Sequence, residues 1–321
     1  MSFVLDHNAT VATMAVQTRC PYSTDVLDGS EPENAEHILP VAFGAPDNFT
    51  VPAKAAKNTE MNDLIDEPAI HDPIMRLIAA AQGVQSRSGA VKVDLAGTAV
   101  ETGANVRVTL GQGHATFKLR NPVDRDPVTG EIRGVMGFGD DAQKLLEQFQ
   151  RDYAKKGKMV VADEAIPRHS DVNVQTAMDY HVVRRELVKI AYLMTVRAFG
   201  DQAIMSESGR LYRAAMMAST IEEFKSVGIG GATFQDFFAG TPRPQRKSQH
   251  ALTCVKLGPT IMSSVTLFGG FNGVFVTPAV GFDAEDAEGE VVIIEASDRK
   301  LSSYKYVDVV ADLMTTGMPQ T

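Results

Sequence analysis

The chain has 321 residues, of which 44% are hydrophobic and 22% charged, and its formal net charge is −9. This length favours two or three domains, and this composition excludes a globally disordered chain. No apolar run is long enough to span a bilayer, residues 1–18 lack the basic start of a signal peptide, and two cysteines exclude a disulfide framework. We therefore expect a cytoplasmic protein without membrane contact.

Hydrophobic periodicity predicts an α+β fold. The expected helices, in chain order, lie near residues 57–65, 71–82, 140–153, 174–199, 211–217, 221–227 and 304–314. The expected strands lie near residues 91–95, 106–110, 117–119, 159–161, 251–257, 261–268, 273–278 and 291–295. Glycines separate the first strands, which predicts a hairpin region, and the later strands suggest a meander.

These elements group into three predicted regions. Residues 1–68 form a small module, residues 69–165 a hairpin and helix region that packs on it, and residues 170–321 an α+β domain of unassigned role. Arg184, Arg185 and Lys189 lie off the apolar face of the long helix. We expect these three cations to be solvated, with ligand contact as the alternative.

Charge is unevenly distributed along the chain. Residues 18–66 hold three basic and nine acidic side chains, whereas residues 67–160 hold thirteen and eleven. An anionic partner would therefore be held by the middle of the chain, and the acidic segment suits a divalent cation. The alternative is that these charges are only solvated surface.

One stretch in the acidic segment carries chemistry. Glu36-His37-Ile38-Leu39-Pro40 is followed by Asn48 and then by Asn58. Adjacent strand residues point to opposite faces, so one of Glu36 and His37 can bind a metal while the other faces a substrate. Asn58 opens a helix, and its side chain can return to the strand across a small ββα unit. Singly, these residues are more typical of turns, caps and core positions; their order and spacing favour a shared site.

This segment resembles the HNH, or ββα-metal, endonuclease family. Residues 36–40 fit the family core "(D/E)-H-(I/V)-x-P". Asn48 fits the middle asparagine of the family motif, and Asn58 fits the motif's last position. The most similar branch carries "EHI-x-P-x-A-x-G", "C-x-x-C-N" and "I-D", which read here as residues 36–44, 54–58 and 65–66. The resemblance covers residues 18–66, which is under a sixth of the chain.

The same branch frames its motif with two zinc-binding C-x-x-C pairs. Those four positions are Cys20, Ser23, Lys54 and Lys57 here. Because a serine and two lysines cannot bind Zn²⁺, we predict no structural zinc. The lost stabilisation must come from packing, for which the candidates are Tyr22, Val41, Phe43, Phe49 and Val51.

The resemblance implies a metal-dependent endonuclease that hydrolyses phosphodiester bonds of nucleic acid, with DNA as the first expectation. It implies His37 as general base, Asn48 as the residue that orients it, and Glu36 and Asn58 as ligands of one divalent ion. That ion is Mg²⁺ in first place, with Mn²⁺ as the alternative. Asn62 or Asp66 is the alternative metal ligand to Asn58 if the match to the family motif is shifted by one helical turn. Candidate phosphate contacts, chosen by position alone, are Lys54, Lys57, Arg87, Lys118 and Arg120.

Two other functions stay open. The module could be a catalytically silent nucleic-acid or protein-binding unit that keeps the ββα shape. Alternatively, the function lies in residues 170–321 and the module is an accessory. A homodimer is compatible with either. The remaining histidines show no metal-ligand spacing, and Cys254 lies in an apolar run and is expected in the core.

Overall fold

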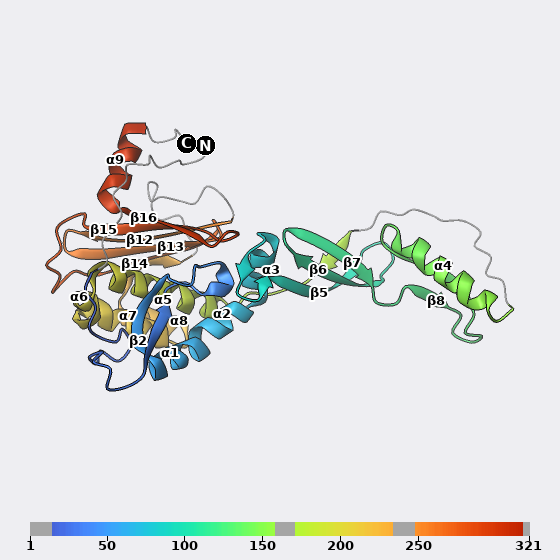
Figure 1. The fold of residues 1–321 in the computed structure, drawn as a ribbon, viewed down its shortest axis with the longest axis horizontal. Helices are drawn as coiled ribbons and strands as arrows, with labels where there is room; N and C mark the ends of the chain where they lie inside the picture. The colour runs from blue at the N-terminus through green and yellow to red at the C-terminus, as the bar shows by residue number, and fades with distance from the viewer. Residues whose placement is uncertain (1–14, 158–170, 234–247, 317–321) are drawn as a thin grey trace. The chain divides into compact units, whose positions relative to one another are not determined.

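The computed structural model describes residues 15–157, 171–233 and 248–316 (Figure 1). The chain divides into two compact units. The first unit consists of Met1–Val91 together with Met178–Thr321, and the second unit is Lys92–Ala177. This division differs from the three predicted regions, because the N-terminal module and the C-terminal half share one hydrophobic core. The predicted strand at residues 159–161 lies outside the described residues.

The first unit is α+β, as predicted. Its N-terminal part contains β1 (Glu33–His37), η1 (Val41–Phe43), β2 (Thr50–Lys54), α1 (Ala55–Met61), the π-helical turn η2 (Asn62–Asp66), α2 (Glu67–His71), α3 (Pro73–Ala81), β3 (Gln85–Ser86) and β4 (Gly89–Ala90). Its C-terminal part contains α5 (Tyr180–Phe199), α6 (Asp201–Met205), α7 (Glu207–Met217), α8 (Ile221–Val227), β11 (Gly230–Thr233), β12 (Gln249–Leu257), β13 (Thr260–Leu267), β14 (Phe271–Pro278), β15 (Gly289–Glu295), β16 (Lys300–Lys305) and α9 (Tyr306–Thr316).

A six-stranded antiparallel sheet organises this unit among the described residues, in the order β11-β14-β13-β12-β15-β16. The predicted meander is present in β12, β13 and β14, and β15 pairs with the free side of β12. Helices α5 and α7 pack on one face of the sheet, whereas α9 lies on the other (Figure 1). The sequence patterns did not predict β16 or α6.

Helix α5 joins the sheet to the N-terminal module. It begins at Tyr180, later than predicted, because Asp179 accepts hydrogen bonds from the backbone N–H groups of His181 and Val182 and so caps it. Fourteen of its twenty residues are buried, so the helix is enclosed by protein on almost every side. One side packs on β12 and β13, and another meets β2, η2 and α2.

The predicted solvation of the three α5 cations is wrong for two of them. Lys189 is 0% exposed and Arg184 is 4% exposed. Arg184 stacks on the ring of Phe224 and donates to the Thr220 carbonyl, and Arg185 donates to the Met216 carbonyl. These contacts satisfy one carbonyl in the last turn of α7 and one in the loop that follows it, which periodicity alone does not reveal.

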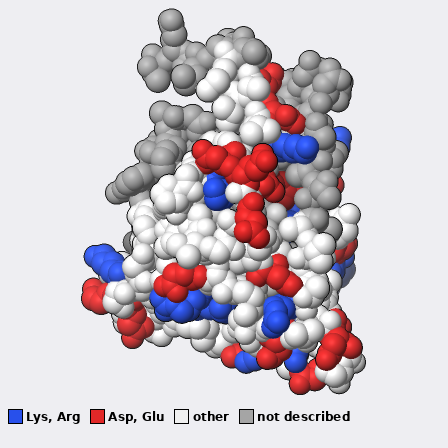
Figure 2. Space-filling view, turned by 90° about the vertical axis from the view of Figure 1, so that its left-hand side faces the viewer, with Lys and Arg blue, Asp and Glu red and all other residues white. Residues whose placement is uncertain are grey.

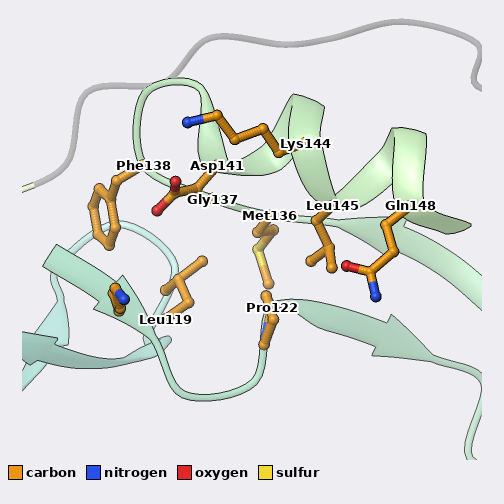
Figure 3. Close-up of a pocket in the computed structure, with 10 residues that line it drawn as sticks. Leu119, Pro122, Met136, Gly137, Phe138, Asp141, Lys144, Leu145 and Gln148 are labelled. Atoms are coloured by element: carbon orange, nitrogen blue, oxygen red, sulfur yellow. The ribbon is translucent and has the colours of Figure 1, made fainter.

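The second unit holds the predicted hairpin region. Its elements are β5 (Lys92–Ala99), β6 (Asn105–Gly111), β7 (His114–Leu119), β8 (Val123–Arg125), β9 (Ile132–Val135), α4 (Asp141–Ala154) and β10 (Val172–Val174). An antiparallel sheet runs in the order β10-β5-β6-β7. A shallow groove of about 300 Å³ lies between the end of β7 and α4, with Leu119, Met136 and Leu145 in its lining (Figure 3).

No helix in the described residues is both long and apolar enough to cross a membrane.

Candidate functional site

The motif lies in a β-hairpin followed directly by a helix. Strands β1 and β2 pair antiparallel, with Glu36 opposite Val51 and His37 opposite Thr50, and α1 starts at the residue after β2. Asn58 in α1 donates from Nδ2 to Asn34 Oδ1 at 2.8 Å and to the Ala35 carbonyl at 3.2 Å. The helix is therefore tied back onto β1 in a ββα arrangement.

Glu36 points into the protein interior. It is 1% exposed, its Oε1 accepts a hydrogen bond from the Tyr22 hydroxyl at 2.8 Å, and the same oxygen lies 2.5 Å from Lys189 Nζ. Burial raises the pKa of Glu36, and the ammonium of Lys189 opposes that shift. The carboxylate implied as a metal ligand is thus held in a buried ion pair.

Lys189 also binds a second carboxylate. Its Nζ lies 2.6 Å from both oxygens of Asp66 in η2, and it reaches the His37 carbonyl at 3.5 Å. Burial lowers the pKa of Lys189, but the Asp66 and Glu36 carboxylates raise it more, so the net shift is upward. The lysine is therefore a permanent cation that links β1, η2 and α5.

A third carboxyl group completes this interior cluster. Glu186, one helical turn before Lys189, is 0% exposed, and neither of its oxygens has a hydrogen-bond partner among the described contacts. Burial and the neighbouring Asp66 raise the pKa of Glu186 well above its usual range. We name Glu36, Asp66, Glu186 and Lys189 the interior charge cluster.

His37 belongs to a different, partly exposed environment. Its Nε2 lies 3.2 Å from Arg87 Nη2, and Arg87 Nε donates to Asp47 Oδ1 at 2.8 Å. Arg299 Nη2 lies 2.8 Å from the other oxygen of Asp47. Burial and then Arg87 lower the pKa of His37, so the imidazole is neutral at pH 7. An acceptor role toward Arg87 assigns the ring proton to Nδ1.

Asn48 is exposed beside Asp47, and no hydrogen bond joins it to His37 in the described contacts. Of the five predicted phosphate contacts, Arg87 alone touches His37. Lys54 pairs with Glu31 at 3.0 Å, and Lys57 pairs with Glu60 at 2.7 Å. Lys118 and Arg120 belong to the other unit.

The four positions that the resemblance compares with a zinc ribbon make contacts within the protein. Cys20 is fully buried and its Sγ accepts from the Lys54 backbone N–H at 3.5 Å. The Lys54 side chain binds Glu31 and Asp25, which hold its pKa above the usual value. The predicted replacement core is present: Phe43, Phe49 and Val51 are buried, and Tyr22 and Val41 are partly buried.

Sequence reasoning missed the partners that determine this site. Lys189, Glu186 and Arg299 are all distant from the motif in the chain, and Tyr22 was expected only as a packing residue. One signal was present: Glu186 and Lys189 interrupt an apolar run in α5, and a charged pair in such a run needs an interior partner.

Within residues 15–157, 171–233 and 248–316, no three His, Cys, Asp or Glu side chains are placed to hold a metal ion. Comparisons of the chain with known protein families, with curated proteins and with solved structures found no match.

Proposed function

We propose that the chain carries an HNH-like ββα module that binds the phosphate backbone of nucleic acid without metal-dependent cleavage. One observation carries the proposal: Lys189 Nζ lies 2.5 Å from Glu36 Oε1, and both side chains are buried. The ammonium stands where the resemblance would put a divalent ion. DNA is the first expectation for the ligand.

The energetics of that pair support a silent module. A divalent ion on Glu36 would lie within a few ångströms of the ammonium, and like charges at that distance in the interior repel strongly. Displacing Lys189 instead would leave a buried charge unpaired, at a cost of about 3–5 kcal/mol. Metal binding at Glu36 is therefore opposed in the wild-type chain.

Arg87 is the group best placed to meet a phosphate. Its side chain is 63% exposed, and its pair with Asp47 is a surface ion pair of the kind worth about 0–1 kcal/mol. A phosphate oxygen can replace Asp47 at little cost, with His37 beside it. Figure 2 shows Lys and Arg beside Asp and Glu on the described part of another face of the protein. Beside Arg87 the cation Arg299 shares Asp47, so we expect few phosphate contacts and modest affinity.

The test compares metal binding, cleavage and DNA binding in the full chain. Calorimetric titration with Mg²⁺ is expected to show no stoichiometric binding, and supercoiled plasmid is expected to stay intact with Mg²⁺ and with EDTA. Arg87→Glu should weaken binding of a fluorescent duplex and reduce its salt dependence. Lys57→Glu, in the same module but paired with Glu60, is the matched control and should change binding less.

A second function has one observation in its favour. His37 is half-buried, its pKa is lowered, and a neutral imidazole in a ββα unit is suited to act as a general base for a metal-dependent nuclease. That function requires Lys189 to withdraw from Glu36. Plasmid cleavage that needs Mg²⁺ and is lost in His37→Ala would establish it and overturn the silent module.

A further inference from the structure

The sheet of the second unit has two unlike faces. One face of β5, β6 and β7 is apolar: Val106 and Val108 are buried there, and Leu95 and Leu119 pack against them. The three strands lie side by side (Figure 1). Because successive strand residues point to opposite faces, the residues between these positions turn to the other face, which is largely exposed.

The exposed face is positively charged. Its long side chains are Lys92 on β5, Arg107 on β6, Lys118 on β7, and Arg120, the residue directly after β7. Asp94 is the one acid at the outward positions of these three strands. The face therefore has a net charge of +3, whereas the net charge of the whole chain is −9.

Three of these cations are neighbours. Arg107 lies directly opposite Lys118 in the register of β6 and β7. The Arg120 backbone N–H donates to the Asn105 carbonyl at 2.9 Å, so the ladder continues past β7 and Arg120 points to the same side as Lys118. Arg107 pairs with Asp94, whereas neither Lys118 nor Arg120 makes an ion pair within the described part of the chain. Two neighbouring cations are thus available to an anion.

We propose that this exposed face of β5, β6 and β7 binds the phosphate backbone of duplex DNA. Thr98, Thr109 and Thr116 lie among the cations, and hydroxyl, Lys and Arg groups are the side chains that contact phosphates. The outward positions of these strands carry no Phe, Tyr or Trp, and single-strand binding relies on such stacking side chains, so a duplex fits better. The inference rests on the proposed function, and it adds a second contact surface to the one at Arg87.

The experiment measures binding of a fluorescent duplex to the full chain across a range of salt concentrations. Lys118→Gln combined with Arg120→Gln removes two phosphate contacts, so the slope of log affinity against log salt should become shallower by about 1.8, and binding at low salt should weaken roughly tenfold. Lys144→Gln combined with Arg151→Gln is the matched control. It removes the same two residue types from α4, where Glu147 lies between them, and it should change the slope less than half as much.

Lysine acetylation followed by mass spectrometry tests the wild-type chain directly, and it decides the matter if a variant fails to fold. Bound duplex should protect Lys118 and leave Lys144 reactive. Equal protection of the two lysines, or the same salt slope in both double variants, overturns the proposal. Protection of Lys118 by heparin in a chain that binds no duplex assigns the face to another polyanion and also overturns it.

Failure of the proposed function gives a different result. If Arg87→Glu leaves duplex binding unchanged while the variant at Lys118 and Arg120 weakens it, the phosphate site at Arg87 is wrong and the sheet face stands. If Arg87→Glu weakens binding and the variant at Lys118 and Arg120 does not, the sheet face is wrong and the proposed function stands. A wild-type chain that binds no duplex overturns both.

Discussion

His250 and Phe43 are joined by a hydrogen bond of 2.8 Å from the imidazole Nε2 to the backbone carbonyl, which fastens strand β12 to the loop of the hairpin. The Phe268 backbone N–H donates to His250 Nδ1 at 3.1 Å, so Nδ1 must be an acceptor and Nε2 must carry the proton. A second proton would place two donors face to face. Both nitrogens are thus specified for a neutral ring.

We predict an acid-dependent loss of stability from His250. Burial lowers its pKa from 6.5 to about 4. Between these values the unfolded chain binds more protons, so the free energy of unfolding falls as pH drops from about 6.5 towards 4, by about 3 kcal/mol in full. Urea denaturation at pH 7.5, 6 and 5 measures it. His250→Gln retains a donor and an acceptor without titrating, and a wild type that loses no more stability than this variant contradicts the prediction.

Gly44 should not tolerate a side chain. Its φ is +92°, and a Cβ there would lie 2.4 Å from the Ala296 carbonyl oxygen and near the Ala296 backbone. We expect Gly44→Ala to lower the free energy of unfolding by about 2–4 kcal/mol, from strain and overpacking together. Gly29→Ala is the control, because its φ is also positive at +75° but nothing lies within 4 Å of the added Cβ. Similar losses in the two variants would show that contact with Ala296 is unimportant.

Replacing the lysine of the interior charge cluster should lower the free energy of unfolding far more than replacing a lysine at the surface. Lys189→Met leaves Glu36 and Asp66 buried without a cation, which we expect to cost about 3–5 kcal/mol of unfolding free energy. Lys57→Met removes only the exposed pair with Glu60 and should cost less than about 1 kcal/mol. Chemical denaturation of both variants, with Lys189→Met combined with Glu36→Gln as a double-mutant cycle, measures the coupling. A coupling energy near zero in this cycle would show that the Lys189–Glu36 ion pair does not stabilise the fold.

Purified protein should hold no structural zinc. The ribbon positions carry one thiol, a serine and two lysines, and the Lys54 side chain already pairs with Glu31 and Asp25. Elemental analysis after dialysis is the measurement, and the expected zinc content is far below one ion per chain. One zinc per chain that EDTA removes together with the fold would contradict this reading.

The elements with strong local signals were predictable from sequence. The spacing of Ile74, Leu77 and Ile78 gave α3, and the alternation from Val93 to Leu110 gave β5 and β6, because one face of each is buried. The order Glu36, His37, Asn58 likewise predicted a hairpin followed by a helix, which the structure has.

The surroundings of the site could not be predicted in the same way. Lys189 reaches Glu36 only because α5 packs across the hairpin, and periodicity gives no information on which faces meet. The prediction that Lys189 is solvated was wrong. Lys189 lies off the apolar face of α5, but that helix is buried on almost every side, so this position is also in the interior. Arg299 directly precedes β16, a strand that the sequence pattern did not predict.

The chain order of the first unit has a consequence for synthesis. Lys189 is 152 residues beyond His37, and the whole of the second unit lies between them in the sequence. At about 5–20 residues per second, Glu36 and Asp66 leave the ribosome roughly six to thirty seconds before the ammonium that neutralises them. The nascent hairpin is therefore acidic and without its core partner for that interval, and release of a chain that ends near residue 91 should yield a fragment that chaperones retain and proteases remove.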